Sequence, residues 1–179
     1  MLRIGAVALA TLGLIACSAP FTDSSSDDWK PFGDLVRHGL TAEENAFVPD
    51  PPVCPGPVPF AVREHLIAGL SVRLSAYFAE PQLAKEISLA TGVVQEKDGP
   101  ACLYGGGVDW VRLDSVSING NSAVAAGQVR LWTKLAQWQG KPVFAEPHNT
   151  VDATFGLARQ NGHWMITHYA WTFARGSEP

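Results

Sequence analysis

The sequence predicts an α+β fold in which N-terminal helices pack on a curved, four-stranded antiparallel meander. Apolar residues recur at helical spacing in the first half of the chain, and the second half alternates between apolar and polar residues. The dipeptides Asn-Gly and Gln-Gly divide that second half at even spacing. Runs of helices followed by runs of strands are typical of α+β domains. A chain of 179 residues is long enough for one such domain.

The first sixteen residues have the pattern of an export signal. Arg3 precedes an uncharged run that extends from Ile4 to Ala16 and ends directly before Cys17. As a helix this run rises about 20 Å, which is less than the roughly 30 Å hydrocarbon core of a bilayer. A run of this length is typical of the hydrophobic region of a signal peptide.

The residues Leu14-Ile15-Ala16-Cys17 resemble the lipobox of bacterial lipoproteins. The resemblance implies that residues 1–16 are a lipoprotein signal peptide, that Cys17 is acylated (palmitate among the acyl groups), and that the protein lies in the cell envelope. Two or three acyl chains hold a protein on a lipid membrane stably, whereas one chain holds it only marginally. An ordinary secretory signal or a buried helix is the alternative interpretation.

Cys54 and Cys102 are the other two cysteines. Because exported proteins lie where disulfides persist, we predict a bond between them. It would close a loop of about 49 residues and stabilise the fold by about 4 kcal/mol. Two free thiols or a metal pair are the alternatives. No CxxC motif occurs and the histidines are scattered, so we expect no metal and no cofactor.

Residues 17–59 are expected to form a lipidated tether followed by a proline-rich strap. Residues 18–30 are polar and rich in Ser and Asp, which is typical of a flexible linker. Residues 31–47 are predicted to hold one or two short helical turns, with Thr41 and Glu44 as a capping box. Residues 48–59 carry six prolines, which disfavour a helix.

Residues 60–179 are expected to form the folded domain. The spacing of Val62, Leu66 and Leu70 predicts a helix over residues 60–78, and a second helix is predicted over residues 82–95. Residues 97–107 are predicted to form a loop. From Trp110 onward, turns at Asn119-Gly120, Gln139-Gly140 and Asn161-Gly162 predict the four strands.

The predicted register of the last hairpin brings together two groups of candidate site residues. A two-residue turn at Asn161-Gly162 would place Leu157 opposite Ile166 and Phe155 opposite His168. The core face would then carry a candidate pocket, and the other face would carry a candidate contact surface, since Trp is frequent at interaction hot spots. The candidate pocket consists of Tyr77, Phe155 and His168; the candidate contact surface consists of Trp132, Asp152, Tyr169 and Trp171. Simple packing is the alternative role for these side chains.

The order of elements over residues 60–175, with the ending Gly162-His163-Trp164-Met165-Ile166, resembles the nuclear transport factor 2-like (NTF2-like) superfamily. The resemblance implies a cone-shaped, cystatin-like fold. The superfamily includes ketosteroid isomerases, polyketide cyclases and accessory domains of bacterial envelope assemblies. Its isomerases need a buried acid inside the cone as a general base.

No catalytic signature stands out in the sequence. The run Gly105-Gly106-Gly107 is not followed by Lys and Ser or Thr, and no Gly-x-Ser-x-Gly motif occurs. The chain has a net charge of −4 and so lacks the basic surface that binding to nucleic acid needs; we expect no nucleic-acid partner.

We therefore expect a membrane-tethered, non-enzymatic protein that binds a small apolar ligand or an envelope protein. The alternatives are a metal-independent isomerase, cyclase or dehydratase that uses the cone cavity, and a structural accessory of a secretion or transport assembly. A buried acid beside an open pocket would favour the enzyme. A filled cone with an exposed aromatic patch on the opposite face of the sheet would favour partner binding.

Overall fold

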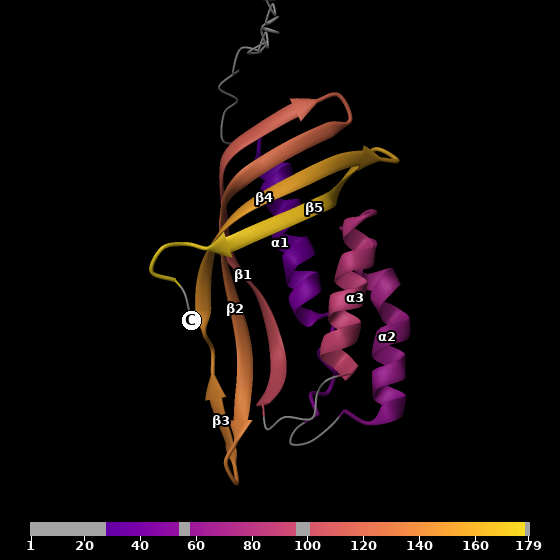
Figure 1. Cartoon of the computed structure of the whole chain (residues 1–179), viewed down its shortest axis with the longest axis vertical. Helices are drawn as coiled ribbons and strands as arrows, with labels where there is room; N and C mark the ends of the chain where they lie inside the picture. Colours follow the sequence, from indigo (N-terminus) through magenta and orange to yellow (C-terminus); the bar gives the residue numbers. More distant parts are fainter. Residues whose placement is uncertain (1–27, 54–57, 96–100, 178–179) are drawn as a thin grey trace, which may run out of the picture.

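The fold was obtained as a computed structural model, which describes residues 28–53, 58–95 and 101–177. Three helices come first: α1 (Lys30–Asn45), α2 (Phe60–Leu74) and α3 (Gln82–Gln95). The strands follow as β1 (Ala101–Asn119), β2 (Ser122–Trp138), β3 (Pro142–Ala145), β4 (His148–Gln160) and β5 (His163–Phe173). The predicted α+β class is confirmed (Figure 1).

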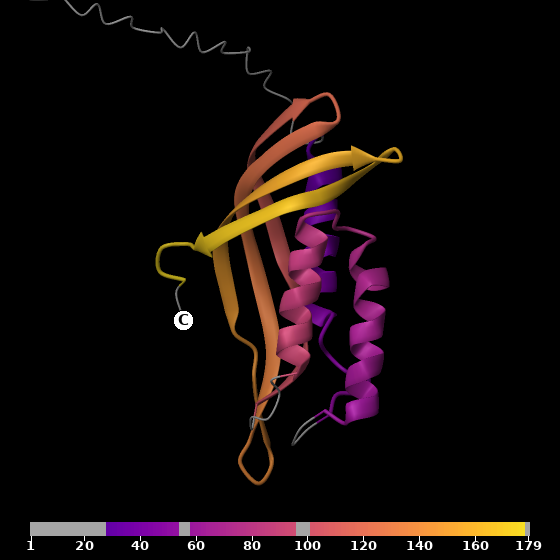
Figure 2. The same ribbon diagram turned by 45° about the vertical axis from the view of Figure 1, so that its right-hand side comes forward.

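The strands form one antiparallel sheet in the order β1-β2-β4-β5, and the short β3 pairs with the far end of β2. The predicted meander is therefore correct, with one short strand added. The sheet curves around the helices, which cover its concave face (Figures 1 and 2). We call the opposite side of the sheet the outer face.

Helix α1 is longer than the sequence pattern predicted. It runs for 16 residues and buries Phe32, Val36 and Leu40, one on each successive turn. Thr41 and Glu44 lie in its last turn, so the predicted capping box, which belongs at the start of a helix, is wrong. The Asn45 side chain donates instead to the carbonyl of Thr41 at 2.7 Å.

Helix α2 ends at Leu74, four residues before the predicted end. The chain turns there because residues 77–79 pair with β5 and no longer follow the helix. Ile166 donates its backbone N–H to the carbonyl of Tyr77 at 2.8 Å, and Ala79 donates to the carbonyl of Ile166 at 2.9 Å. Helix α3 begins at Gln82 and ends at Gln95, as predicted.

Strand β1 begins at Ala101, so the loop predicted over residues 97–107 is wrong from that residue on. The glycines belong to the strand because α1 passes close to it. A Cβ atom on Gly106 would lie 2.7 Å from the Glu44 carboxylate and 2.9 Å from the backbone oxygen of Trp132. Only a glycine fits between helix and strand at this position.

The turn at Asn161-Gly162 is confirmed, with both residues at positive φ, as a type I′ hairpin requires. Leu157 lies opposite Ile166, also as predicted. Beyond that pair Thr167 is an extra residue in β5, and its hydroxyl donates to the carbonyl of Gly156 at 3.1 Å. This bulge moves every later side chain of β5 to the other face of the sheet.

The interior of the cone is filled with side chains. The rings of Phe155 and Tyr169 are stacked with centroids 5.1 Å apart, and Phe78 and Ile166 are fully buried beside the sheet. Aliphatic residues from all three helices and from the concave face complete one core. Among the described residues these side chains form one continuous core between the helices and the sheet.

Candidate functional site

The candidate pocket of Tyr77, Phe155 and His168 is not one pocket. Phe155 is buried in the core, and Tyr77 is half-buried after the end of α2. His168 lies opposite Gly156 and is exposed on the outer face, so the predicted pairing of His168 with Phe155 is wrong. The bulge at Thr167 is the reason, because it exchanges the positions of His168 and Tyr169.

The candidate contact surface is likewise divided between the two faces. Tyr169 is only 5% exposed and belongs to the core, which corrects its predicted place. Trp171 lies opposite Ala153, so it shares the face of Tyr169 and not that of Asp152. Trp132 and Asp152 remain on the outer face, where Trp132 is half-buried against Gly107.

A buried acid, Glu86, and a half-buried one, Glu43, lie in the space between α1, α3 and β5. Glu86 on α3 is 2% exposed and accepts a short hydrogen bond from the amide of Gln82, which is itself 3% exposed. The Gln82 oxygen in turn accepts from the backbone N–H of Tyr169 at 3.1 Å. Glu43, in the last turn of α1, is hydrogen-bonded to Glu86. A hydrogen bond between two carboxyl groups requires a proton on one of them.

Burial and charge repulsion decide which form of Glu43 is stable. Loss of hydration, followed by repulsion from Glu86, raises the pKa of Glu43 to about 9. Glu43 is therefore a neutral hydrogen-bond donor at neutral pH. Burial also raises the pKa of Glu44, although a hydrogen bond from Thr133 at 3.2 Å opposes that shift. Burial and the nearby acids raise the pKa of Tyr169 as well.

Glu43 and Glu86 reach a small pocket between the three helices. The pocket has a volume of about 150 Å³ and is otherwise mostly apolar. Its other lining residues are Ala46, Phe47, Leu74, Leu89, Ala90 and Val93. We call it the helix pocket. Leu89 is 54% exposed and Val93 is 37% exposed, so the pocket opens beside an apolar strip of α3.

Sequence reasoning missed the acid cluster. Glu43 and Glu86 lie 43 positions apart, and no motif connects them. One signal was present: Gln82, Glu86 and Ala90 recur every four residues on α3 and form a buried stripe with polar members. Polar residues within such a stripe indicate a buried hydrogen-bond network.

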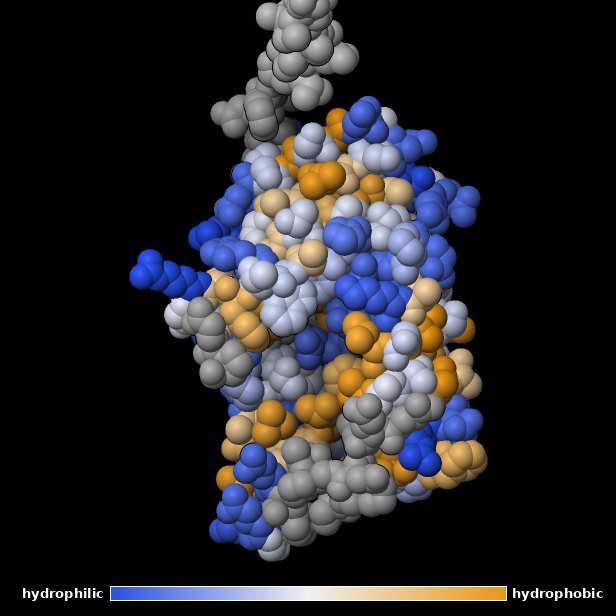
Figure 3. Space-filling model, in the orientation of Figure 1, coloured by the Kyte–Doolittle hydropathy of each residue, from blue (hydrophilic) through white to orange (hydrophobic). Residues whose placement is uncertain are grey.

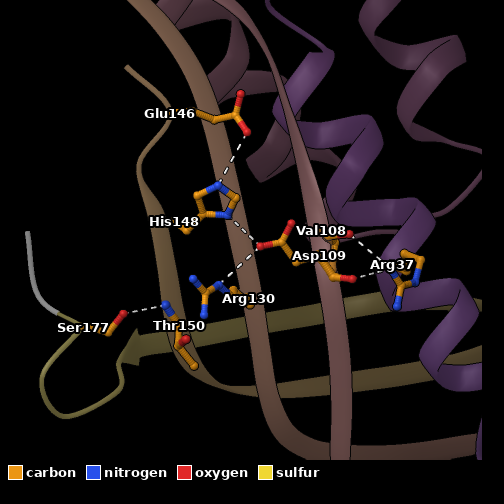
Figure 4. A network of polar contacts seen from close by, with 8 residues as sticks. All are labelled: Arg37, Val108, Asp109, Arg130, Glu146, His148, Thr150 and Ser177. Carbon is orange, nitrogen blue, oxygen red and sulfur yellow. Dashed lines mark hydrogen bonds and ion pairs between the residues drawn. The ribbon is translucent and has the colours of Figure 1, made fainter. Parts of the chain in front are cut away.

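The outer face carries a separate polar network (Figure 4). The Asp109 carboxylate lies 2.7 Å from Nδ1 of His148 and 3.3 Å from Nε of Arg130. His148 also faces Glu146 at 3.5 Å. On the other side of β1, Arg37 donates to the carbonyls of Val108 and Asp109 at 3.1 and 3.0 Å. These contacts join α1 to three strands and so have a structural role.

A shallow hollow of about 440 Å³ lies farther along the sheet. Its lining residues include Asp114, Asp152, Thr154, Trp171 and Thr172. The Asp152 carboxylate accepts from Gln128 at 2.8 Å, and Gln128 accepts from Arg112 at 2.7 Å. The hollow mixes polar and apolar lining residues, and the Asp152 carboxylate within it is already hydrogen-bonded.

Within residues 28–53, 58–95 and 101–177, no group of three His, Cys, Asp or Glu side chains is placed to hold a metal ion. In the same ranges no helix has the length and hydrophobicity needed to cross a bilayer. Cys102 is buried at the start of β1. Cys17 and Cys54 lie outside the described residues, so the lipid anchor and the disulfide stay predictions.

Comparison with known proteins places the chain by fold. No family model matches it. No curated protein matches it either. Among solved structures it is similar to the intermembrane space region of the chloroplast protein ARC6, with a TM-score of 0.56 and 13% identity. That match covers 86% of this chain and all of the other.

More distant similarities have TM-scores below 0.5. A periplasmic fragment of TraM gives 0.49 at 13% identity, covering 84% of this chain and 98% of the other. An NTF2-like protein with a cystatin-like fold, from Novosphingobium aromaticivorans, gives 0.40 at 13% identity, covering 84% of each chain. NTF2-like proteins are thus among the structural neighbours. The chain has the cone-like α+β fold, and these similarities carry no activity over to it.

Proposed function

We propose that the chain is a lipid-anchored, extracytoplasmic interaction domain, a structural accessory of an assembly in the cell envelope. One observation carries the proposal: the cone is filled, and the helix pocket of about 150 Å³ opens beside exposed apolar side chains of α3. The signal segment and Cys17 support the anchor, with the residues before α1 as the tether and residues 48–59 as the strap. Disulfide formation between Cys54 and Cys102 belongs to the same proposal.

The size of the helix pocket supports a protein partner over a small molecule. Sites for drug-sized ligands have volumes of about 300–1,000 Å³. A pocket of about 150 Å³ holds one side chain, as hot-spot pockets at protein interfaces do. The exposed Leu89 and Val93 would pack around that side chain and exclude water from it.

Surface hydrophobicity points to the same helices. Phe60 and Val72 on α2 are 68% and 78% exposed, and α2 and α3 pack side by side. Hydrophobic side chains lie among hydrophilic ones where these helices reach the surface (Figure 3). The single O–H of neutral Glu43 serves Glu86, so toward an anchoring residue both acids act as acceptors, for example from Tyr, Trp or Arg.

The test is site-specific photo-cross-linking of the full-length protein in intact cells of its host. A photoreactive residue at Leu89 should give a discrete protein adduct, and one at Val143 should give none. Val143 is a matched control because it is 44% exposed and lies on β3, far from the helix pocket. Leu89→Asp and Val93→Asp should abolish co-purification with the partner, whereas Val143→Asp should preserve it. Equal adducts at both positions would contradict the proposal.

A second candidate function is a metal-independent isomerase, cyclase or dehydratase. The pair Glu43 and Glu86 favours it, because a carboxyl group with a raised pKa beside a pocket suits general acid–base chemistry. The pocket limits a substrate to a few heavy atoms. Exchange of the α-protons of butanone in D₂O, followed by NMR, would detect such activity. It should disappear in Glu43→Gln and Glu86→Gln and persist in Glu64→Gln, an exposed control on α2.

A further inference from the structure

We propose that the tips of the β1–β2 and β4–β5 hairpins lie against the membrane that holds acylated Cys17. The occupant of this surface is a bilayer with anionic headgroups. This inference rests on the lipid anchor of the proposed function and adds an orientation to it. Neither the filled cone nor the helix pocket is needed for it.

The two tips and the start of α1 lie at one end of the molecule (Figures 1 and 2). Phe32, in the first turn of α1, packs against Trp164 beside the β4–β5 turn, with ring centroids 5.3 Å apart. Arg159, on the other arm of that hairpin, donates its backbone N–H to the carbonyl of Asn121 at 2.8 Å. Asn121 belongs to the β1–β2 turn. The chain that leads from Cys17 therefore enters the fold beside both tips.

The length of the tether limits how the domain can lie. Residues 18–28 separate Cys17 from Trp29, and eleven residues span at most about 40 Å. Strand β2 alone, with 17 residues, extends about 55 Å away from this end. The hairpin formed by β2 and β3 lies at the opposite end. The tether thus favours contact between the membrane and the near tips.

The chemistry of the β1–β2 tip fits a lipid surface. From Ser115 to Val129 no residue carries a charge, although the hairpin is exposed at its end. Ile118 is 57% exposed and Val124 is 53% exposed. Hydrophobic side chains are visible at this upper end of the surface (Figure 3). Apolar side chains without charged neighbours can enter the headgroup region without loss of ion hydration.

The β4–β5 tip adds charge complementarity. No acidic residue occurs from Ala153 to Ser177, whereas Arg159 and His163 flank the turn. In a chain of net charge −4, the β4–β5 tip itself carries no acid and offers Arg159 to the phosphates of anionic lipids. Asp34, an acid at the same end, is paired with Lys30 at 2.6 Å.

A weak contact is sufficient because the anchor keeps the domain near the surface. Tethering converts membrane contact into an intramolecular event with a high effective concentration. Two exposed apolar residues and one arginine would not hold a free protein on a bilayer. They can still set the orientation of an anchored one.

The experiment uses the full-length, lipidated protein reconstituted in vesicles of phosphatidylethanolamine and phosphatidylglycerol. A nitroxide label is attached at Ile118→Cys or, as the control, at Val143→Cys. Collisions with oxygen and with a water-soluble nickel complex are measured by electron paramagnetic resonance. At Ile118 the label should gain oxygen accessibility and lose nickel accessibility when vesicles replace detergent-free buffer. At Val143 both should stay unchanged.

The outcomes separate this inference from the anchor. Flotation of the protein with vesicles tests the anchor by itself. The wild-type protein should float, and Cys17→Ala should not. A floating protein whose Ile118 label stays open to nickel would overturn the inference and leave the anchor intact. A protein that does not float refutes both. Loss of nickel access that requires an added envelope protein would assign the tip to a protein partner, and so would also overturn the inference.

Discussion

Replacement of Glu43 by Gln should remove most of the pH dependence of stability that the buried acid pair creates. Glu43 has a pKa of about 9 in the folded protein and 4.5 as an ordinary carboxyl group. The folded state therefore keeps a proton that the unfolded state releases. The resulting stability is fully present below about pH 4.5 and is lost progressively up to about pH 9, by as much as ~1.4 kcal/mol per pH unit.

The size of the expected change in unfolding free energy follows from the difference between the two pKa values. A neutral Gln has no proton to lose on unfolding, and its amide can still donate to Glu86. Between about pH 5 and about pH 7.5, the wild-type free energy of unfolding should fall by up to about 3 kcal/mol through this group. The variant should show little of that fall. At about pH 7.5 Glu43→Gln should be the more stable protein.

Urea unfolding followed by tryptophan fluorescence at several pH values measures this difference. Glu64→Gln, an exposed replacement on α2, is the matched control and should keep the wild-type pH dependence. If Glu43→Gln unfolds with the same pH dependence as the wild type, Glu43 does not hold the proton, and the account of the acid pair is wrong.

Four further outcomes are expected. Non-reducing mass spectrometry should find a peptide linked through Cys54 and Cys102, and reduction should lower the melting temperature; two freely alkylated thiols would refute the bridge. Tyr169→Ala should cost about 3–5 kcal/mol in urea unfolding because it empties the stacked core, whereas His168→Ala should change stability by less than about 0.5 kcal/mol. Gly106→Ala should cost about 1–3 kcal/mol through its clash with Trp132 and Glu44; a neutral effect would disprove the close approach. Gly92→Ala, with open space around it in α3, should stabilise by about 0.5–1 kcal/mol in the same assay.

Patterns along the chain were enough to predict the fold class and the residue pairing nearest the last turn. Helical spacing located α3, and Asn161-Gly162 located the β4–β5 turn. Leu157 and Ile166 then pair as the turn dictates. Such features depend on local geometry, which the sequence encodes over a few residues.

The face of each residue at the end of β5 was not predictable in the same way. The bulge at Thr167 depends on tertiary contacts, because Ile166 also pairs with residues 77–79 across the fold. One inserted residue then decides that Tyr169 stacks on Phe155 while His168 faces water. Period-two alternation carries no information on where such a residue is inserted.

The acid pair could not be predicted for a different reason. Glu43 and Glu86 come from two helices whose packing brings them together. Glu43 resembles a surface glutamate in its sequence context, and the stripe of Gln82, Glu86 and Ala90 indicates a buried network without indicating its partner on α1. Long-range proximity of this kind has no local signature in a single sequence. The same holds for the glycines of β1, which resemble a loop until α1 is placed against them.

The hydrogen bonds from Arg37 to β1 have a mechanical consequence. Arg37 holds the carbonyls of Val108 and Asp109 from the helix side, while the Asp109 carboxylate holds Arg130 and His148 on the outer face. A force applied to the tether would reach α1 first and pass through Arg37 into the middle of the sheet. We expect Arg37→Ala to lower the unfolding force in single-molecule pulling from the N-terminus more than in pulling from the C-terminus. A protein anchored at one end in a moving envelope would gain resistance to shear from this arrangement.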